Sequence, residues 1–347
     1  IRRVLGSFPD WSEPVVFSPP VFRVVIAAAL VAAACGVPVG GRTSAATIEI
    51  VDDFGDTLRL AQPAERIVSL NPVITEALFA LGAGARLVGR THWDTSPVAA
   101  LAVPDLGDGM QPNVEAVLAA RPELIVLYAS NANRAAATAF RRAGVQTLTM
   151  HTNRIGDLPR ALHRLGLAIG DTATARRVAD SVTRSLDAVR GRPRGAVRPT
   201  VFWHAWDAPV ITIGAGSYLN ELVDIAGARN VFGDLSQPSP QVTLESVARR
   251  NPDFILAGPV AARRLRADAR WQAVPAVRKH QVLVIDTSIV GRPGVRMGEA
   301  ARFLRAALDS ALELVRAGAG HVILGMPARL GPAGLLAVAR EVAEPLR

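Results

Sequence analysis

Apolar positions recur with a helical period between residues 172 and 190, and this stretch organises the rest of the chain. Asp171 stands directly before it in the place of an N-cap, and Pro193 follows shortly after its end. A rise of about 1.5 Å per residue gives a helix about 28 Å long, which is the width of one small domain. The apolar residues that lie three or four positions apart on one face are Val178, Val182, Leu186 and Val189. We therefore predict a backbone helix over residues 172–190.

The sequence on the two sides of this helix shows the same patterns twice. Residues 66–89 and 210–233 each contain a β-branched strand, a tight turn and a helix, with Gly-Ala-Arg after it. Residues 111–127 and 239–256 each contain a Pro-led turn, a short helix, an Arg-Pro or Asn-Pro dipeptide and a strand. Two repeated patterns in the same order predict two related lobes. The predicted fold class is α/β: two Rossmann-like lobes with mainly parallel sheets, joined by one long backbone helix.

The patterns divide the chain into five segments. Residues 47–154 are expected to form a first α/β lobe, 155–195 the linking helices around the backbone helix, and 196–316 a second α/β lobe. A signal or lipoprotein segment with a tether is expected at 1–46, and a Gly-, Pro- and Ala-rich peripheral tail at 317–347. Other expected elements are a hairpin at 48–51 and 57–60, strands at 86–89, 124–128, 145–150, 200–203, 254–256 and 282–285, and helices at 135–143, 158–169 and 300–315.

The first segment has the parts of an export signal. Arg23 precedes an unbroken apolar run at 24–34, which is shorter than the about 20 residues that span a bilayer. The sequence Ala-Ala-Ala-Cys that ends at Cys35 resembles the lipobox of bacterial lipoproteins, in which the cysteine is lipidated after cleavage. Cleavage after Ala46 is the alternative. Either event predicts an exported protein, periplasmic or lipid-anchored on the outer face of the cytoplasmic membrane.

Composition excludes several classes of protein. Half of the 347 residues are apolar and a fifth are charged, which is typical of a folded globular protein. The net charge of +9 comes from arginines scattered through both lobes, so it does not predict a nucleic-acid surface. Cys35 is the only cysteine, which excludes a disulfide framework and a thiolate metal cluster. The sequence lacks a Gly-x-Ser-x-Gly elbow and a His-Glu-x-x-His motif, and we predict that the protein is not an enzyme.

Aromatic residues of this aromatic-poor chain gather at two predicted turns. His92 and Trp93 follow one predicted strand, and Trp203 and Trp206 lie at the end of another. In open α/β sheets, ligands bind outside the carboxyl ends of the strands. A large flat or hydrophobic ligand held between the lobes would stack on such side chains. The alternative is that Trp203 and Trp206 only cover the sheet.

Metal and phosphate chemistry have less support in the sequence. The six histidines form no pair three or four positions apart, so no preformed metal site is predicted, although His92 or His204 could ligate a metal inside a bound macrocycle. The turn at 214–217 lacks the glycine spacing and the lysine of a nucleotide loop. Arg292 and Arg296 lie in a turn with Gly and Pro, where they could clamp acidic groups of a ligand or be solvated loop arginines.

Several segments taken together resemble one known family. They are RIVSLNPVITEALFALGAGARLVG, PNVEAVLAARPELIVL, PQVTLESVARRNPDFIL, WQAVPAVRKHQVLVID and GRPGVR. With the export signal, they resemble class III periplasmic binding proteins of ABC importers, the helical-backbone receptors for cobalamin, haem and iron-siderophores. The resemblance covers about residues 47–315. It is greatest to cobalamin-binding proteins, through the turn after Gly89, the Pro-Gln-Val before Glu245 and the Arg-Pro-Gly-x-Arg turn.

The resemblance implies a function and a set of residues. It implies an extracytoplasmic component that captures a small-molecule metal chelate, with cobalamin favoured, and delivers it to an ABC importer permease dimer. No cofactor of its own is expected. The expected ligand-binding residues are His92, Trp93, Trp203, Trp206, Arg292 and Arg296. Glu76 and Glu245 match the acidic residues that dock each lobe onto permease arginines, although the helix dipole alone also favours a glutamate at an exposed helix start.

The identity of the chelate stays open at this point. His92 and Trp93 stand where the cobalamin receptors commonly have tyrosine or another aromatic residue, which leaves haem or a siderophore as alternatives. A zinc or manganese receptor of similar architecture would need several histidines and carboxylates that meet in the cleft, and the scattered histidines do not predict this.

Overall fold

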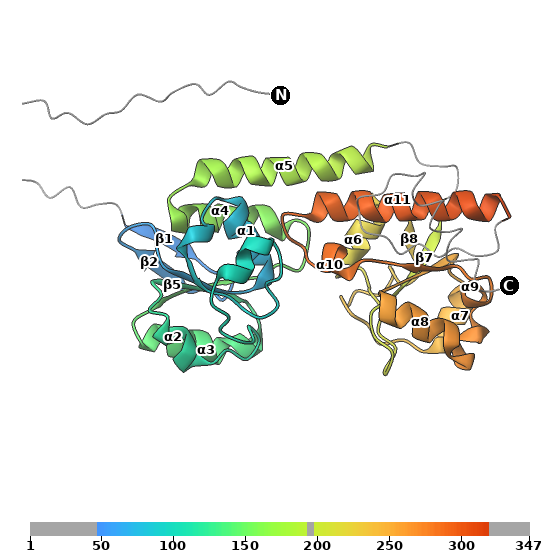
Figure 1. Ribbon diagram of the computed structural model, residues 1–347, viewed down its shortest axis with the longest axis horizontal. Helices are drawn as coiled ribbons and strands as arrows, with labels where there is room; N and C mark the ends of the chain where they lie inside the picture. Colours follow the sequence, from blue (N-terminus) through green and yellow to red (C-terminus); the bar gives the residue numbers. More distant parts are fainter. Residues whose placement is uncertain (1–46, 193–197, 319–347) are drawn as a thin grey trace, which may run out of the picture. The chain divides into compact units, whose positions relative to one another are not determined.

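Two four-stranded parallel sheets form the centres of two lobes in the computed structural model, which describes residues 47–192 and 198–318 (Figure 1). The first sheet has the strand order β4-β3-β5-β6, and the second has the order β8-β7-β9-β10, with every neighbouring pair parallel. The strands are β3 (Ile67–Leu70), β4 (Leu87–Gly89), β5 (Leu124–Tyr128) and β6 (Gln146–Met150), then β7 (Thr200–His204), β8 (Arg229–Asn230), β9 (Phe254–Ala257) and β10 (Val282–Val284). The two lobes share one topology, and the predicted fold class is confirmed.

The central strands are buried on both faces, as expected for parallel strands between helices. In β3 and β5, Ile67 and Val126 pack into one hydrophobic cluster, whereas their neighbours Val68 and Ile125 pack into another. The two-residue period of a strand sends successive side chains to opposite faces. Each lobe therefore has an apolar layer on each side of its sheet.

Helices cover the sheets, and several begin at residues with capping side chains. Asn113 accepts the N–H of Ala116 at the start of α2, and Thr243 accepts the N–H of Ser246 at the start of α7. The helices of the first lobe are α1 (Pro72–Ala80), α2 (Val114–Ala119) and α3 (Asn131–Arg142), with 3-10 turns η1 (Gly84–Arg86) and η2 (Val98–Ala102). Those of the second are α6 (Tyr218–Ile225), α7 (Leu244–Arg250), α8 (Pro259–Ala267), η3 (Ala269–Ala273), α9 (Pro275–Arg278) and α10 (Thr287–Val290).

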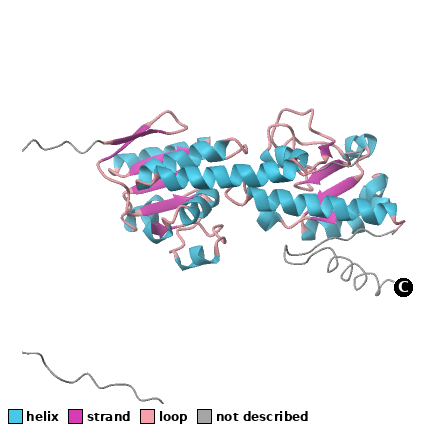
Figure 2. Cartoon of the chain, turned by 90° about the horizontal axis from the view of Figure 1, so that it is seen from above, coloured by secondary structure: helices cyan, strands magenta, loops and turns pink. Residues whose placement is uncertain are grey.

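The predicted backbone helix is present as α5 (Thr172–Arg190), and Asp171 caps it by accepting the N–H of Thr174 at 2.8 Å. It packs against α4 (Asp157–Ile169) and against the last described helix, α11 (Met297–Arg316). Figure 2 looks down on this layer of helices, beneath which the strands lie. One hydrophobic cluster runs through α4, α5 and α11 and includes residues of both sheets. The two lobes are therefore joined by packed helices.

Two glycines allow these helices to approach one another closely. A Cβ at Gly166 of α4 would lie 2.6 Å from the Cβ of Ala175 in α5. A Cβ at Gly298 of α11 would lie 1.8 Å from Oγ and 2.5 Å from Cβ of Ser185 in α5. Real side chains do not approach this closely, so both helix contacts depend on the absence of a side chain.

A β-hairpin begins the first lobe, as predicted. It consists of β1 (Ile48–Val51) and β2 (Thr57–Leu60), and the carboxylate of Asp52 closes its turn by accepting two backbone N–H groups. Asp53 in the same turn pairs with Arg164 of α4 at 2.5 Å. Both side chains are mostly buried, so the hairpin is attached to the helix layer.

Some expected boundaries are wrong. The strand expected at 210–214 is not formed, because Ile211 makes only isolated bridges to Trp206 and Gln241. The strand that precedes α6 is β7, and the β-branched residues after it bond to the turn at Trp206 and to residues 240–242. Smaller corrections are that η1 takes up Arg86, that α3 begins at Asn131 and that α11 begins at Met297.

Parts of the sequence-based expectations lie outside the described residues. These are the export and tether segment at 1–46, with Cys35, and the tail from residue 319 onward. Among the residues that the structure does describe, none of the helices is sufficiently long and apolar to cross a membrane.

Replacing Gly298 with alanine should lower the free energy of unfolding by about 1 to 3 kcal/mol, because the added methyl group must displace Ser185 or separate α11 from α5. Urea unfolding followed by circular dichroism measures this change. Gly156→Ala is the matched control, because a Cβ at Gly156 meets no atom within 4 Å, and it should change the stability by less than about 0.5 kcal/mol. Equal stabilities of the two variants would contradict the close helix contact.

Candidate functional site

Trp93 lies in a loop after β4 that a buried aspartate holds in place. Asp94 is fully buried, and its Oδ2 accepts hydrogen bonds from the N–H and the hydroxyl of Thr91, both at 2.6 Å. The Thr91 hydroxyl oxygen in turn accepts the N–H of Trp93 at 3.2 Å. Trp93 is 59% exposed, and the ring of the exposed His92 lies 4.6 Å from the Trp93 ring. A fixed backbone thus presents two adjacent rings to solvent.

Trp206 borders a cavity of about 650 Å³ in the second lobe. The cavity lies at the carboxyl ends of β7 and β9 and beside the first residues of α6 and α8. Its volume falls within the range of about 300 to 1,000 Å³ that is usual for small-molecule sites. Trp206 is 62% exposed, Val260 is also exposed, and Arg264 and Asp207 add polar groups to the lining. The cavity can therefore hold an apolar body with a polar edge.

The other aromatic residues at this turn belong mostly to the core. Trp203 is 6% exposed and packs in the cluster that connects the lobes, and its carbonyl accepts the hydroxyl of Thr212 at 2.7 Å. The His204 side chain is buried as well, with Nε2 at 2.8 Å from Oδ1 of Asp207. Both residues line the cavity. Trp203 therefore packs mainly in the core behind the cavity wall, whereas the exposed ring of Trp206 is available for stacking.

The histidines do not converge in the described part of the chain. Within residues 47–192 and 198–318, no group of three or more His, Cys, Asp or Glu side chains could hold a metal ion. His204 is engaged by Asp207, and His92 stands beside Trp93 on the first lobe. His92 is thus the histidine with an exposed ring next to a stacking candidate.

Arg292 and Arg296 bind groups of the protein itself in this structure. Nη1 of Arg292 donates to Oε1 of Glu76 at 2.8 Å, and Nη2 donates to the carbonyl of Trp93. Arg296 pairs with a carboxylate of its own helix, and its Nη1 lies 3.4 Å from Oγ of Ser96. Both arginines come from the segment between α10 and α11, and both reach residues of the first lobe. Their expected contact with a ligand stays a prediction.

The expectation that Glu76 is an exposed docking residue is wrong. Glu76 is 4% exposed on α1, and most of this helix is buried. Arg292, which is 216 positions away in the sequence, covers its carboxylate. A glutamate near a helix start looks the same in the sequence whether it faces solvent or a distant arginine. Glu76 belongs to a contact between the lobes.

Burial raises the pKa of the Glu76 carboxyl and that of the Asp94 carboxyl. For Glu76, loss of hydration is the largest cause, and the hydrogen bond and charge of Arg292 oppose it. For Asp94, loss of hydration is again the largest cause, and hydrogen bonds from Thr91 oppose it. The negative charge of Asp94 also raises the pKa of Glu76, and the guanidinium of Arg292 favours the ionised form of both. One arginine from the second lobe therefore neutralises part of a buried acidic pair.

Glu245 is exposed in the first turn of α7, and the shared topology pairs it with a residue that sequence reasoning missed. Helices α2 and α7 precede the equivalent strands β5 and β9, and Glu115 occupies in α2 the position that Glu245 occupies in α7. Glu115 is exposed too. The sequence contained a signal of this equivalence: when NVEAVLAARP is aligned with TLESVARRNP, the two glutamates fall at the same position. Glu115, not Glu76, is the counterpart of Glu245.

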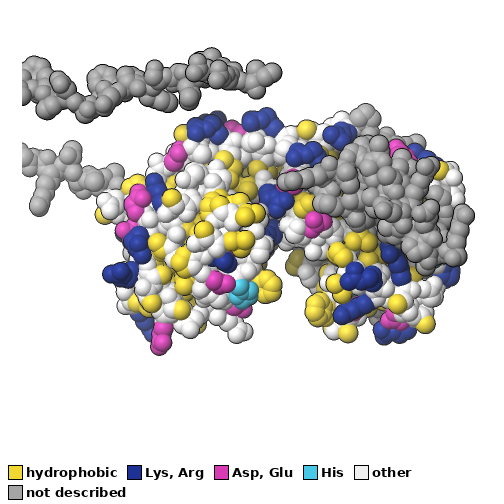
Figure 3. Space-filling view, viewed as in Figure 1, with side chains coloured by type: hydrophobic (Ala, Val, Ile, Leu, Met, Phe, Trp, Pro, Cys, Tyr) yellow, Lys and Arg dark blue, Asp and Glu magenta, His cyan; other side chains and the backbone are white. Residues whose placement is uncertain are grey.

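Exposed apolar side chains also extend the first-lobe surface beyond Trp93. Val98 and Leu101 in η2, and Met110 after it, are each at least 46% exposed. Gly109 packs against Thr91, which places Met110 next to the Trp93 loop. Figure 3 shows hydrophobic side chains gathered on both lobes. Exposed apolar patches are a common feature of binding surfaces. The sequence did not indicate these three residues, because an isolated valine, leucine or methionine looks the same whether it is buried or exposed.

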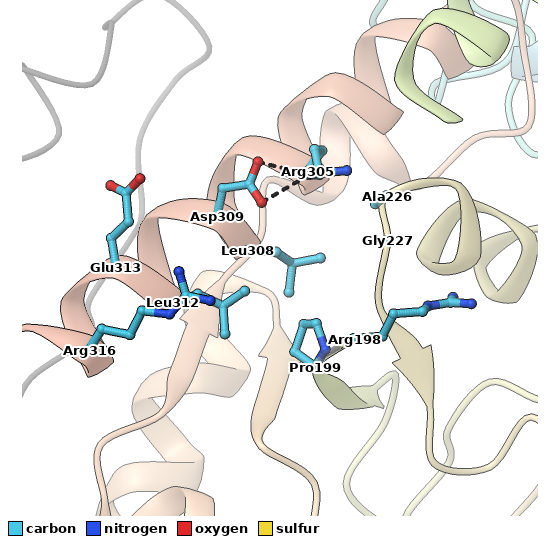
Figure 4. Close-up of a pocket in the computed structure, with 10 residues that line it drawn as sticks. All are labelled: Arg198, Pro199, Ala226, Gly227, Arg305, Leu308, Asp309, Leu312, Glu313 and Arg316. Carbon is cyan, nitrogen blue, oxygen red and sulfur yellow. Dashed lines mark hydrogen bonds and ion pairs between the residues drawn. The ribbon is translucent and has the colours of Figure 1, made fainter. Parts of the chain in front are cut away.

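A second cavity, of about 250 Å³, lies between α11 and the loop after α6 (Figure 4). Nε of Arg305 donates to both carboxylate oxygens of Asp309, at 2.9 and 2.8 Å, along one wall. Leu308, Leu312 and charged side chains make up most of the rest, and none of the residues that line this cavity is aromatic. It is smaller than usual ligand sites, so the aromatic turns are the stronger candidates.

A model of the family described as periplasmic binding protein matches residues 67–288, which is more than half of the chain. The chain belongs to the periplasmic binding protein family. This periplasmic binding protein is 27% identical over 294 residues to a protein of Bacillus subtilis named uncharacterized ABC transporter substrate-binding lipoprotein YvrC. The match covers 80% of this chain and 93% of that protein. The family predicted from the sequence motifs is confirmed.

Solved structures of two receptors have the same fold. The vitamin B12-binding protein BtuF of Vibrio cholerae is 25% identical with a TM-score of 0.63, and the match covers 72% of this chain and 99% of that one. The haem-binding protein RhuT of Roseiflexus sp. RS-1 is 24% identical with a TM-score of 0.65 over the same shares. These relatives of the periplasmic binding protein are named as binding proteins, which confirms the prediction of a protein that is not an enzyme.

The contribution of Glu76 to stability should fall as pH rises. Because its pKa is raised above the ordinary value of 4.5, the folded protein holds this proton more tightly than the unfolded chain does. The free energy of unfolding of the wild type, relative to that of Glu76→Gln, therefore falls as pH rises from the ordinary pKa through the raised one. Urea unfolding of both proteins between about pH 4 and pH 7 measures the difference. If the free energy of unfolding of the wild type, relative to that of Glu76→Gln, instead grows with pH, attraction to Arg292 outweighs the loss of hydration.

Proposed function

We propose that this periplasmic binding protein captures a large metal chelate, with cobalamin favoured, between the surfaces that carry Trp93 and Trp206. The receptor then delivers the chelate to the permease dimer of an ABC importer. The observation that carries the proposal is the pair of tryptophans, 59% and 62% exposed, at turns that follow parallel strands in the two lobes. Tryptophan is highly buried on average and is enriched at binding interfaces, so two exposed tryptophans at matched turns favour a binding surface.

Three relatives support a chelate of this class. One is named as a binding protein for vitamin B12, another for haem, and a third, from Saccharomonospora viridis, as part of a transport system for ferric hydroxamate. Exposed apolar side chains on both lobes, together with Arg264 at the cavity, fit a flat ligand with acidic or polar substituents. Haem and a ferric siderophore are the alternatives to cobalamin.

A zinc or manganese ion is a weaker candidate ligand. The described residues contain no cluster of metal-binding side chains, and the cavity beside Trp206 is far larger than a bare cation needs. A metal would instead arrive inside a chelate, where His92 has an exposed ring that could reach it.

Docking to the permease is proposed to use Glu115 and Glu245. Both glutamates are exposed in the first turn of equivalent helices, and Figure 1 shows α2 and α7 on the side of the sheets away from α5. Two matched acidic positions suit a permease built from two equal subunits. Export, with a lipid anchor at Cys35 as one form, would place the receptor outside the cytoplasmic membrane.

Cyanocobalamin titration of the ligand-free protein tests the ligand proposal. We expect sub-micromolar binding, and we expect Trp93→Ala and Trp206→Ala each to weaken it at least about tenfold, because stacking on an aromatic ring is lost. Tryptophan fluorescence or calorimetry measures the affinity. The same titration with haemin and with a ferric hydroxamate ranks the alternatives.

Val51→Thr is the control for that titration, because Val51 is also exposed but lies in the hairpin strand β1. It should bind as the wild type does. Undiminished binding by both tryptophan variants would place the ligand elsewhere, and failure of all three chelates to bind would reject the ligand class.

Charge reversal at both Glu115 and Glu245 should abolish uptake by cells while chelate binding by the purified protein stays intact. The physical reason is that the basic groups of the permease would then face basic side chains on the receptor, and like charges repel. Uptake of labelled ligand and equilibrium binding are measured side by side. Glu49→Arg, at another exposed glutamate, is the control and should leave uptake unchanged. Normal uptake by the double variant would overturn the docking assignment.

A further inference from the structure

Two glutamate–arginine pairs join the lobes at equivalent places of the repeated fold. Glu76 lies in α1 after β3, and Glu221 lies in α6 after β7, the strand equivalent to β3. Each glutamate binds an arginine of the opposite lobe: Arg292 for Glu76 and Arg154 for Glu221. Arg154 follows β6 and Arg292 comes from the segment after β10, which are again equivalent strands. We call these pairs the first clasp, Glu76–Arg292, and the second clasp, Glu221–Arg154.

The two clasps differ in burial. The side chains of the first clasp are 3% and 23% exposed, whereas those of the second are 25% and 48% exposed. Solvent screens exposed ion pairs, and many of these contribute little to stability. A buried carboxylate that loses its partner is left without hydration or a counter-charge. Loss of the first clasp should therefore disturb the segments that it joins more than loss of the second clasp would.

The two clasps also hold different segments. In the second clasp, Glu221 accepts the N–H of Ile155, and the nearby N–H of Tyr218 donates to the carbonyl of Asn153 at 3.1 Å, so it fixes the chain that leads into α4. In the first clasp, Arg292 donates to the carbonyl of Trp93 as well as to Glu76. Only a guanidinium has donors in the fork geometry that reaches both acceptors at once. The first clasp thus ties the loop that carries the exposed ring to the second lobe.

Apart from Arg292, a side chain of the second lobe that reaches the Trp93 loop is that of Arg296, whose Nη1 lies at 3.4 Å from Oγ of Ser96. The amides of the loop bond within the first lobe: the N–H of His92 donates to Gly107, and the N–H of Thr95 donates to the same Trp93 carbonyl that Arg292 binds. The ring itself is 59% exposed, so core packing does not fix its position. Its orientation toward the second lobe is then set through the backbone, by Asp94 on one side and Arg292 on the other.

We propose that Arg292 is a positioning residue for ligand capture, which holds the Trp93 loop against the second lobe through Glu76 and does not itself bind the ligand. The proposal rests on the proposed function, in which Trp93 contacts the chelate. It replaces the expectation that Arg292 clamps acidic groups of the ligand. In this arrangement Glu76 has the role of an anchor for the guanidinium.

Hydrogen exchange of the ligand-free protein tests the positioning role. Glu76→Gln and Arg292→Met should each speed exchange of the amides in residues 90–97 by about tenfold, because the Trp93 carbonyl loses a charged donor or that donor loses its anchor. Glu221→Gln, in the second clasp, is the matched control and should leave exchange of this segment unchanged. Arg292→Lys, which keeps the charge but not the fork, should fall between the wild type and Arg292→Met.

Cyanocobalamin binding by the same variants separates a positioning role from direct contact. Positioning predicts that Glu76→Gln and Arg292→Met weaken binding to a similar extent, about tenfold, and that the double variant is no weaker than either single variant. Weaker binding by Arg292→Met alone, with normal exchange in residues 90–97, would overturn the proposal and make Arg292 a ligand contact. If the wild type binds no chelate, the proposed function fails, whereas the exchange measurement still decides whether Arg292 positions the loop.

Discussion

The packing of α5 against α4 and α11 is the constraint on which the rest of the structure depends. These helices share one hydrophobic cluster with both sheets, and Gly166 and Gly298 bring their backbones so close that a methyl group would not fit. A connection of this kind resists large rotations of one lobe against the other, in contrast to a flexible hinge of loops. The proposed binding surfaces would therefore be close to their working arrangement before a ligand arrives, and this favours preorganised recognition.

Electrostatic contacts between the lobes refine that arrangement. Glu76 and Asp94 are buried together, and the guanidinium that compensates them comes from the opposite lobe. A buried charge without its partner is costly, so arrangements of the lobes that separate Arg292 from Glu76 are disfavoured. The Trp93 loop lies directly on this contact, which links the placement of an exposed aromatic ring to the interior of the protein.

Periodicity and internal repetition were enough to predict the fold. Both patterns reflect which segments form helices or strands and which faces of them are buried. The bounds of α5 agree with the predicted helix, and the two sheets have the predicted parallel strands. Contacts between distant residues were not predictable in the same way. Nothing near Glu76 indicates an arginine 216 positions away, and the β-branched residues at 210–214 resemble a strand of the sheet although Ile211 makes only isolated bridges outside it. The exposed Trp93 and Trp206 were found because rare aromatic residues follow strands, whereas Met110 and Val260 carry no such mark.

The shared strand order of the lobes gives each position in one half of the chain a structural counterpart in the other. Counterparts that carry the same residue, such as Glu115 and Glu245, suit a requirement common to both halves, and the proposed contact with a permease of two equal subunits would be such a requirement. Counterparts that differ suit a ligand without that symmetry. The loop around Trp93 and the bridges around Trp206 are built differently, so two lobes of one topology present unlike surfaces, and these suit a molecule that is itself asymmetric.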